Sequence, residues 1–374
     1  MLPDFRLEKY FSRWEFRARF HLTASDAETL ALDELLALAT PEDRRRFETM
    51  RLGYTETWGA PALREAIAST YDDVTADEVL VFAGAEEGIF AAMQVLLDAD
   101  NHAIVVTPNY QAAETVPASI CDVTGVALDP DREWHLDVDA VGDALRPNTK
   151  LLSINFPHNP TGKVIPRADF EALVELCANR GIYLFADEVY RLLERDDARR
   201  LPQAADCYER GLSLNVMSKA YGLPGLRIGW IASKDRALLQ RMERAKHYLS
   251  ICNSGPSEQL AIIALKAREQ ILERNRTLIA ENLELLNAFF ADHETLFDWT
   301  VPDGGCIGYP RYNGKDGVEQ FCKSLVEDAG VLLLPAGVYR SELTGSPTDR
   351  FRIGYGRSGI DEALAAFRCF LDAR

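Results

Sequence analysis

Short apolar runs alternate with stretches of helical periodicity along the middle of the chain. The runs are four to eight residues long and show no strict alternation of apolar and polar positions; they cover 79–83, 103–106, 123–128, 150–156, 182–186, 212–217 and 226–233. Such runs predict strands that are covered on both faces, with helices such as 86–98 and 167–180 as crossovers. The pattern therefore predicts an α/β fold with a mainly parallel seven-stranded sheet.

The pattern changes in the last third of the chain. A long helical stretch with polar faces covers 256–291, and a closing helix covers 360–372. Between them lie short, strand-like segments, at 304–312, 331–335 and 349–354. At roughly 150 residues per domain, the length favours one large domain and a smaller one. We expect a large domain at 45–265 and a small α+β domain made of 1–44 and 266–374.

The composition narrows the classes of partner. A chain of 374 residues with 47% hydrophobic and 26% charged residues is typical of a globular protein. Its formal net charge of -17 opposes broad contact with nucleic acid or anionic lipid. No apolar run approaches a membrane span, and residues 1–20 lack the apolar core of a signal peptide. Seven scattered cysteines form no CxxC pair or Cys/His cluster. We expect a cytoplasmic protein that binds small molecules, with no metal, membrane or nucleic acid partner.

Polar residues follow three of the predicted strands. The segments HNPTG, ADEVY and SKAYGLPGLR lie at 158–162, 186–190 and 218–227. Ligands of parallel sheets bind at the carboxyl ends of strands, so we expect these segments to meet there. Asp187 directly follows an apolar strand, where an unpartnered carboxylate costs several kcal/mol. It therefore needs a cation or a strong donor, whereas Lys219 taken alone reads as an ordinary surface charge.

These motifs, together with GYTETWG at 53–59, GAEEG at 84–88 and FRIGYG at 351–356, resemble the aspartate aminotransferase superfamily. Its members are fold-type I enzymes that use pyridoxal 5′-phosphate (PLP), and the resemblance runs from about residue 53 to 357. It implies a Schiff base between PLP and Lys219, whose amine later moves the α-proton. Asp187 is expected against the pyridine nitrogen. Asn159 and Tyr190 are expected to donate hydrogen bonds to the phenolic oxygen.

The same resemblance assigns the remaining contacts. The phosphate is expected to meet the N-terminus of a helix and two side chains beyond a later strand; these residues are Gly84, Ala85, Glu86, Ser218 and Arg227. Tyr110 is expected to stack on the pyridine ring, and Arg352 to hold the α-carboxylate of a free amino acid. Tyr54 matches the tyrosine that reaches the phosphate of a neighbouring subunit. The resemblance therefore implies a homodimer.

The N-terminal segment departs from the family pattern. Residues 19–30 read RFHLTASDAETL and lack the glycine of the family's flexible segment. We expect Glu8, His21 and Thr23 to contact substrate, and His21, Thr23 and Ser25 alternate on one face of an extended segment. Ser25 and Glu28 also have the spacing of a capping box for a helix that begins near Asp26.

Three functions are compatible with these residues to different degrees. We expect a PLP-dependent aminotransferase that acts on a free α-amino acid. The alternative is a lyase or cyclase of the branch related to capreomycidine synthase and the enduracididine cyclases, which forms a cyclic guanidine from a hydroxylated arginine. The replaced N-terminal segment resembles that branch, and Glu86, unusual beside a phosphate, would suit a cationic side chain. A regulatory PLP-binding domain fits poorly, because the fifty residues before GYTETWG are too few and are not basic.

Overall fold

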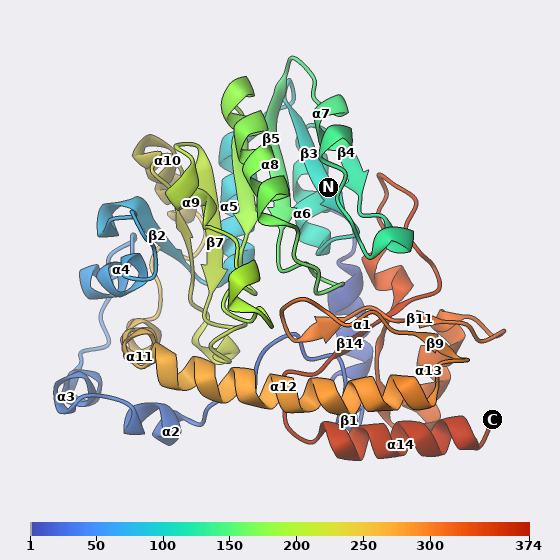
Figure 1. Ribbon diagram of the computed structural model, residues 1–374. Coiled ribbons are helices and arrows are strands. Elements are labelled where there is room, and N and C mark those ends of the chain that lie inside the picture. The colour runs from blue at the N-terminus through green and yellow to red at the C-terminus, as the bar shows by residue number, and fades with distance from the viewer. Residues whose placement is uncertain (1) are drawn as a thin grey trace.

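A seven-stranded sheet forms the centre of the computed structural model, which describes residues 2–374 (Figure 1). The strand order is β2-β8-β7-β6-β5-β3-β4. β8 runs antiparallel to β2 and β7, while the other neighbours are parallel. The predicted mainly parallel sheet is therefore confirmed. Its strands are β2 (Val79–Phe82), β3 (His102–Thr107), β4 (Asp122–Ala127), β5 (Thr149–Asn155), β6 (Tyr183–Asp187), β7 (Gly211–Val216) and β8 (Gly229–Ala232).

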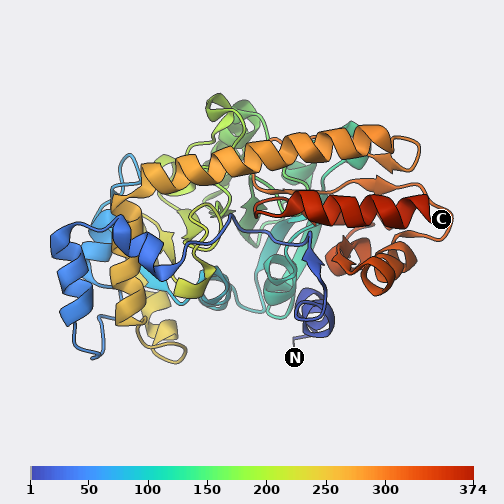
Figure 2. The same ribbon diagram turned by 90° about the horizontal axis from the view of Figure 1, so that it is seen from below.

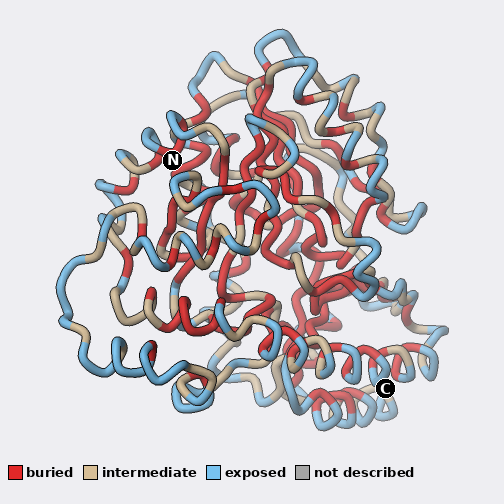
Figure 3. Tube along the Cα trace, turned by 60° about the vertical axis from the view of Figure 1, so that its left-hand side comes forward, coloured by how far each residue is buried: buried red, intermediate tan, exposed pale blue. Residues whose placement is uncertain are grey.

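Helices cover both faces of this sheet, which explains why its strands read as continuous apolar runs. α8 and α9 lie on one face, and α5 and α10 on the other (Figure 1). Figure 3 shows the strands as the most deeply buried part of the trace. α8 has the predicted bounds and ends at Gly181, which adopts a left-handed conformation with φ 63. The helices are α4 (Pro61–Ala68), α5 (Ala85–Leu96), α6 (Gln111–Ala118), α7 (Val138–Asp143), α8 (Arg167–Arg180), α9 (Ala204–Cys207) and α10 (Arg236–Lys246).

The helical stretch predicted at 256–291 consists of two helices, α11 (Gly255–Lys266) and α12 (Arg268–Asp292). The break is at Ala267, whose backbone leaves the helical region with φ -95 and ψ 15. α12 and the closing helix α14 (Ile360–Asp372) run side by side along the molecule (Figure 2). Short elements lie between them: β9 (Phe297–Asp298), β10 (Ile307–Gly308), β11 (Arg311–Tyr312), α13 (Val318–Ala329), β12 (Val331–Leu332), β13 (Leu334–Pro335) and β14 (Phe351–Gly354).

The helix expected near Asp26 is absent from the described chain, so the capping-box interpretation of Ser25 and Glu28 is wrong. α2 begins only at Leu32, and Glu28 accepts hydrogen bonds from Ser358 instead. The reason lies in close backbone packing against β14. A Cβ on Gly354 would lie 1.9 Å from the carbonyl oxygen of Ala24, and one on Gly356 would lie 2.1 Å from that of Asp26. The segment therefore passes over β14 in an extended form.

The remaining elements are those of the N-terminal region and short 3-10 helices spread along the chain. They are α1 (Arg6–Trp14), β1 (Phe20–His21), α2 (Leu32–Ala37), α3 (Pro41–Thr49) and the short 3-10 helices Ala76–Glu78, Pro130–Arg132, Asp197–Arg199, Pro224–Leu226 and Ala336–Tyr339. β1 pairs in parallel with β12, which ties the N-terminal segment to the C-terminal part of the chain. The domain boundaries at 45 and 265 stay a prediction. Within residues 2–374, every helix falls short of the length and apolar character that crossing a membrane requires.

Candidate active site

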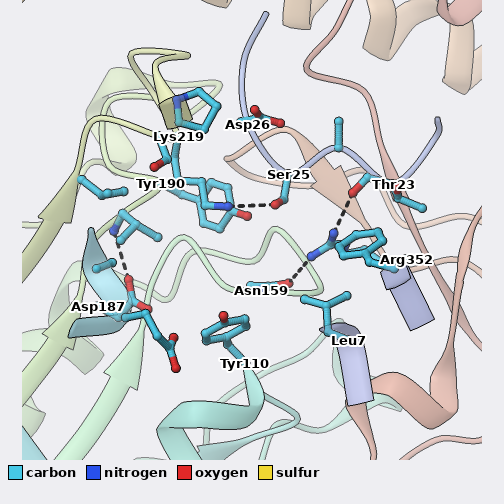
Figure 4. Close-up of a pocket in the computed structure, with 18 of the residues that line it drawn as sticks. Leu7, Thr23, Ser25, Asp26, Tyr110, Asn159, Asp187, Tyr190, Lys219 and Arg352 are labelled. Carbon is cyan, nitrogen blue, oxygen red and sulfur yellow. Dashed lines mark hydrogen bonds between the residues drawn. The ribbon is translucent and has the colours of Figure 1, made fainter. Parts of the chain in front are cut away.

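A pocket of about 510 Å³ lies at the carboxyl ends of β5, β6 and β7 (Figure 4). Parallel strands present the segments that follow them at one edge of the sheet, which brings distant polar side chains together there. Most of the predicted site residues line this pocket: Glu8, His21, Thr23, Ala85, Glu86, Tyr110, Asn159, Asp187, Tyr190, Ser218, Lys219, Arg227 and Arg352. Gly84 caps the neighbouring helix α5. Tyr54 lies outside the pocket, with 93% of its surface exposed.

Lys219 follows β7 and points into the pocket. Its Nζ donates a hydrogen bond to Oγ of Ser25 at 2.8 Å. Burial lowers the pKa of Lys219, the nearby charge of Asp26 raises it, and the cation of Arg352 lowers it again. The neutral amine is the nucleophilic form of lysine, so a lowered pKa favours attack on a carbonyl carbon.

Asp187 and Tyr190 occupy the floor of the pocket at the end of β6. Burial raises the pKa of the Asp187 carboxyl to about 6, although a hydrogen bond from the backbone N–H of Val189 and the charge of Lys219 lower it. The hydroxyl of Tyr190 is buried and has no hydrogen-bond partner among residues 2–374. Such groups rarely stay unsatisfied in the absence of a ligand. A ring with a cationic nitrogen and an anionic oxygen would satisfy both.

The N-terminus of α5 forms the anion-binding end of the pocket. Gly84 caps the helix with φ 93, and a Cβ there would lie 2.5 Å from Nη2 of Arg227. Ala85 at the first turn and Ser218 line the same end of the pocket. Free helical N–H groups, a hydroxyl and a guanidinium suit a phosphate dianion. Together with the pocket floor, this arrangement fits pyridoxal phosphate.

The carboxyl group of Glu86 lies beside this anion-binding end, and its environment raises its pKa. Burial raises its pKa to about 7, a hydrogen bond from Tyr110 lowers it, and the charges of Asp187 and Glu8 raise it further. A carboxyl with such a pKa is partly protonated near neutral pH and repels a phosphate less than a full anion would. The unusual residue is thus compatible with the expected phosphate position.

Arg352, on β14, is only 1% exposed and is held by two neighbours. Its Nη1 donates to Oδ1 of Asn159 at 3.2 Å, and its Nη2 to the carbonyl oxygen of Thr23 at 2.7 Å. The buried Nε has no acceptor among the described residues. A fixed guanidinium with a free donor suits a substrate carboxylate. Thr23 therefore contacts Arg352 through its backbone, and the Asn159 amide keeps its NH₂ group available as a donor.

Sequence reasoning did not assign Ser25, Asp26 and Arg357 to the site, although all three line the pocket. Asp26 forms an ion pair with Arg357 at 2.7 Å, and its charge raises the pKa of Lys219. The alternation of His21, Thr23 and Ser25 was the signal that could have found Ser25. A cap requires a helix after it, and the extended backbone removes that interpretation.

The chain is similar to known proteins both in sequence and in structure. The family model described as aminotransferase class I and II matches residues 23–367. Capreomycidine synthase of Streptomyces vinaceus is 28% identical over 370 residues, which are 98% of this chain and 93% of that protein. A PLP-dependent aminotransferase from Streptococcus suis superposes with a TM-score of 0.92 at 28% identity, covering 100% of this chain and 98% of that one. The PLP-dependent cyclase OrfR superposes with a TM-score of 0.90 at 25% identity, with the same coverage.

Proposed function

From the premise that this chain belongs to the class I and II aminotransferase family and is a PLP-dependent enzyme, we propose that it is an aminotransferase of free α-amino acids. One observation carries the proposal. Lys219, Asp187 and Arg352 converge on one pocket although they come from three different places, the segment after β7, the end of β6 and β14 of another sheet. An amine, a carboxylate and a guanidinium at these places match the aldehyde, the ring nitrogen and the substrate carboxylate respectively.

Each residue then has a defined task. When bound, the cofactor supplies an electron sink beside the substrate α-carbon. Nζ of Lys219 takes up the proton of the α-carbon and returns it. The carboxylate of Asp187 pairs with the ring nitrogen and keeps it protonated, while Asn159 and Tyr190 donate hydrogen bonds to the phenolic oxygen.

The other assigned residues bind and orient. The phosphate is held by the start of α5 and by two side chains, through Gly84, Ala85, Glu86, Ser218 and Arg227. Tyr110 packs against the ring face. Arg352 fixes the substrate carboxylate, so the Cα–H bond is oriented before proton transfer.

A second candidate function is elimination and cyclisation of a hydroxylated, arginine-like amino acid. Two observations favour it. Carboxylates of Glu8 and Glu15, from the region of α1, line the pocket with Glu86 and offer charge for a guanidinium. Capreomycidine synthase also matches nearly the whole chain, including this N-terminal region. His21 and Thr23 would border the substrate side chain in either reaction.

A single-turnover experiment separates the two reactions. Holoenzyme without an amino acceptor is mixed separately with each amino acid of a panel that includes arginine and 4-hydroxyarginine. The masses of the products are then measured by mass spectrometry. A 2-oxo acid means transamination, and a product lighter than substrate by one water means elimination or cyclisation. Lys219→Ala is the control and is expected to form neither. A panel that gives no product and no change in cofactor absorbance would contradict both candidates.

The proposal also includes a homodimer in the cytoplasm. Large apolar side chains are exposed on neighbouring parts of the chain, with 85% of Leu52, 93% of Tyr54, 92% of Tyr248 and 53% of Ile251 accessible. A second copy of the chain would cover these side chains and bring its own Tyr54 to the anion-binding end of this chain's pocket. Sedimentation measurements test the assembly, and a monomer at all concentrations would contradict it. The scattered cysteines, which form no CxxC pair, support the cytoplasmic location.

A further inference from the structure

A second cavity, of about 280 Å³, lies behind the floor of the active-site pocket. Its walls come from the end of α4, the segment after β6, strands β7 and β8 and the start of α12. Val189 and Val216 line both this cavity and the active-site pocket. The two spaces are therefore neighbours that share a wall.

Four arginines line this cavity: Arg191, Arg200, Arg268 and Arg276. Three carboxylates line it too: Asp72, Asp197 and Glu269. Arg200 pairs with Asp197 and Glu194, and Arg268 pairs with Glu269. Within residues 2–374, Arg191 and Arg276 have no carboxylate within 4.0 Å. Two of the four guanidinium groups in this cavity therefore form no direct ion pair within the described chain, although carboxylates also line the cavity.

Arg191 is the more constrained of the two. Its Nε is buried and has no acceptor among the described residues. Burial raises the pKa of the adjacent Glu188 to about 7, although the charge of Arg191 lowers it. The Glu188 carboxylate accepts its hydrogen bonds from Ala204 N, Ser213 Oγ and Asn215 Nδ2 rather than from Arg191. A buried donor without an acceptor is costly, so the protein holds Arg191 in a state that an anion would relieve.

Arg276 and the aromatic wall are held in place. Nε of Arg276 donates to the carbonyl oxygen of Leu192 at 2.6 Å, and Leu192 itself has φ 77. Trp230 and Tyr71 line the same cavity, and Nε1 of Trp230 donates a hydrogen bond to the hydroxyl of Tyr71 at 2.9 Å. Fixed aromatic side chains reduce the water around the guanidinium groups, which strengthens their attraction for an anion.

We infer that this arginine cavity binds a small metabolite that carries two or more oxyanion groups, either a di- or tricarboxylate or a phosphate. The cavity is large enough for such a molecule, and planar guanidinium groups bind carboxylate and phosphate oxygens in pairs. The site is separate from Arg352, which faces the substrate carboxylate in the other pocket. It uses none of the residues that the proposed function requires.

Calorimetric titration of the PLP-loaded enzyme tests the inference, with citrate and inorganic phosphate as separate probes. Tighter binding of citrate identifies carboxylate chemistry, and tighter binding of phosphate identifies phosphate chemistry. Arg191→Gln and Arg276→Gln are each expected to weaken binding at least tenfold, since each removes a charge-assisted contact. Arg180→Gln, an exposed arginine at the end of α8, makes the same change in net charge and is expected to leave binding unchanged.

Arg352→Gln separates this site from the active site and is expected to retain binding. Circular dichroism and the cofactor absorbance confirm that each variant is folded and loaded. The inference is overturned if neither probe releases or absorbs heat at millimolar concentrations. It is also overturned if binding survives both Arg191→Gln and Arg276→Gln, or is lost in Arg352→Gln alone.

Discussion

Replacing Asp187 by asparagine is expected to stabilise the cofactor-free protein near neutral pH. Burial raises the pKa of this carboxyl to about 6, above its ordinary value of 3.8, and the charge of Lys219 offsets only part of that shift. The carboxylate oxygen accepts a hydrogen bond from the Val189 N–H at 3.2 Å, which an asparagine oxygen can also accept. The substitution therefore removes a poorly solvated charge and keeps the shape and one contact.

The direction in which the free energy of unfolding changes with pH follows from proton binding. A carboxyl whose pKa is raised by folding binds its proton more tightly in the native state, so ionisation costs stability. The cost is absent well below pH 3.8, grows between pH 3.8 and 6, and is complete above pH 6. A shift of two pKa units corresponds to about 2 to 3 kcal/mol. An asparagine side chain carries no such cost, so the apo form of Asp187→Asn is expected to be more stable by about 2 kcal/mol at pH 7.5.

Equilibrium urea unfolding of the two apoproteins at pH 4 and pH 7.5 measures this difference. Asp100→Asn, at an exposed turn, is the matched control and is expected to change stability by less than about 0.5 kcal/mol at either pH. With PLP added the order is expected to reverse, because the wild type gains the pairing of Asp187 with the ring nitrogen. An Asp187→Asn apoprotein that is equally or less stable at pH 7.5 would refute the reasoning.

Three further predictions concern the proposed roles. Lys219→Ala is expected to gain no cofactor mass after borohydride reduction, unlike the wild type; covalently retained cofactor in the variant would contradict the assignment. Arg352→Gln is expected to lower kcat/KM at least 100-fold, mainly through KM, because a bidentate contact with the substrate carboxylate is lost; an unchanged KM would argue against that contact. Ser25→Ala removes the acceptor for Nζ of Lys219 and is expected to lower the pKa of that amine further. The pH dependence of amine modification in the apoprotein measures this shift, and a rise would be the wrong sign.

The central sheet was predictable because its strands carry their own signal. All seven apolar runs became strands, and β8 is the one that runs antiparallel to its neighbours. Helix ends were harder to predict where the sequence contains no helix-terminating residue. The break at Ala267 lies between α11 and α12, both helical and both with apolar positions, so periodicity alone joined them.

The prediction of a helix near Asp26 in the N-terminal segment was wrong for a different reason. Ser25 and Glu28 have the spacing of a cap, but Ala24 and Asp26 pack closely against Gly354, the last residue of β14, and Gly356 just after it, and residues 24–31 form no helix. One carboxylate oxygen of Glu28 then accepts hydrogen bonds from Ser358, 330 residues away, instead of from the backbone N–H of Ser25 that a capping box would require. A contact over that separation leaves no trace in a local pattern.

The sequence by itself determined the strands, the polar segments at their carboxyl ends and the family resemblance, since each depends on residues close together along the chain. Only the tertiary structure decided that Lys219 meets Ser25, and that Arg352 meets Asn159 across 193 residues. It also decided which groups change their pKa, because desolvation depends on everything packed around a side chain. The same holds for the arginine cavity, where distant segments bring four arginines together and leave two of them, Arg191 and Arg276, without a direct ion pair in the described chain.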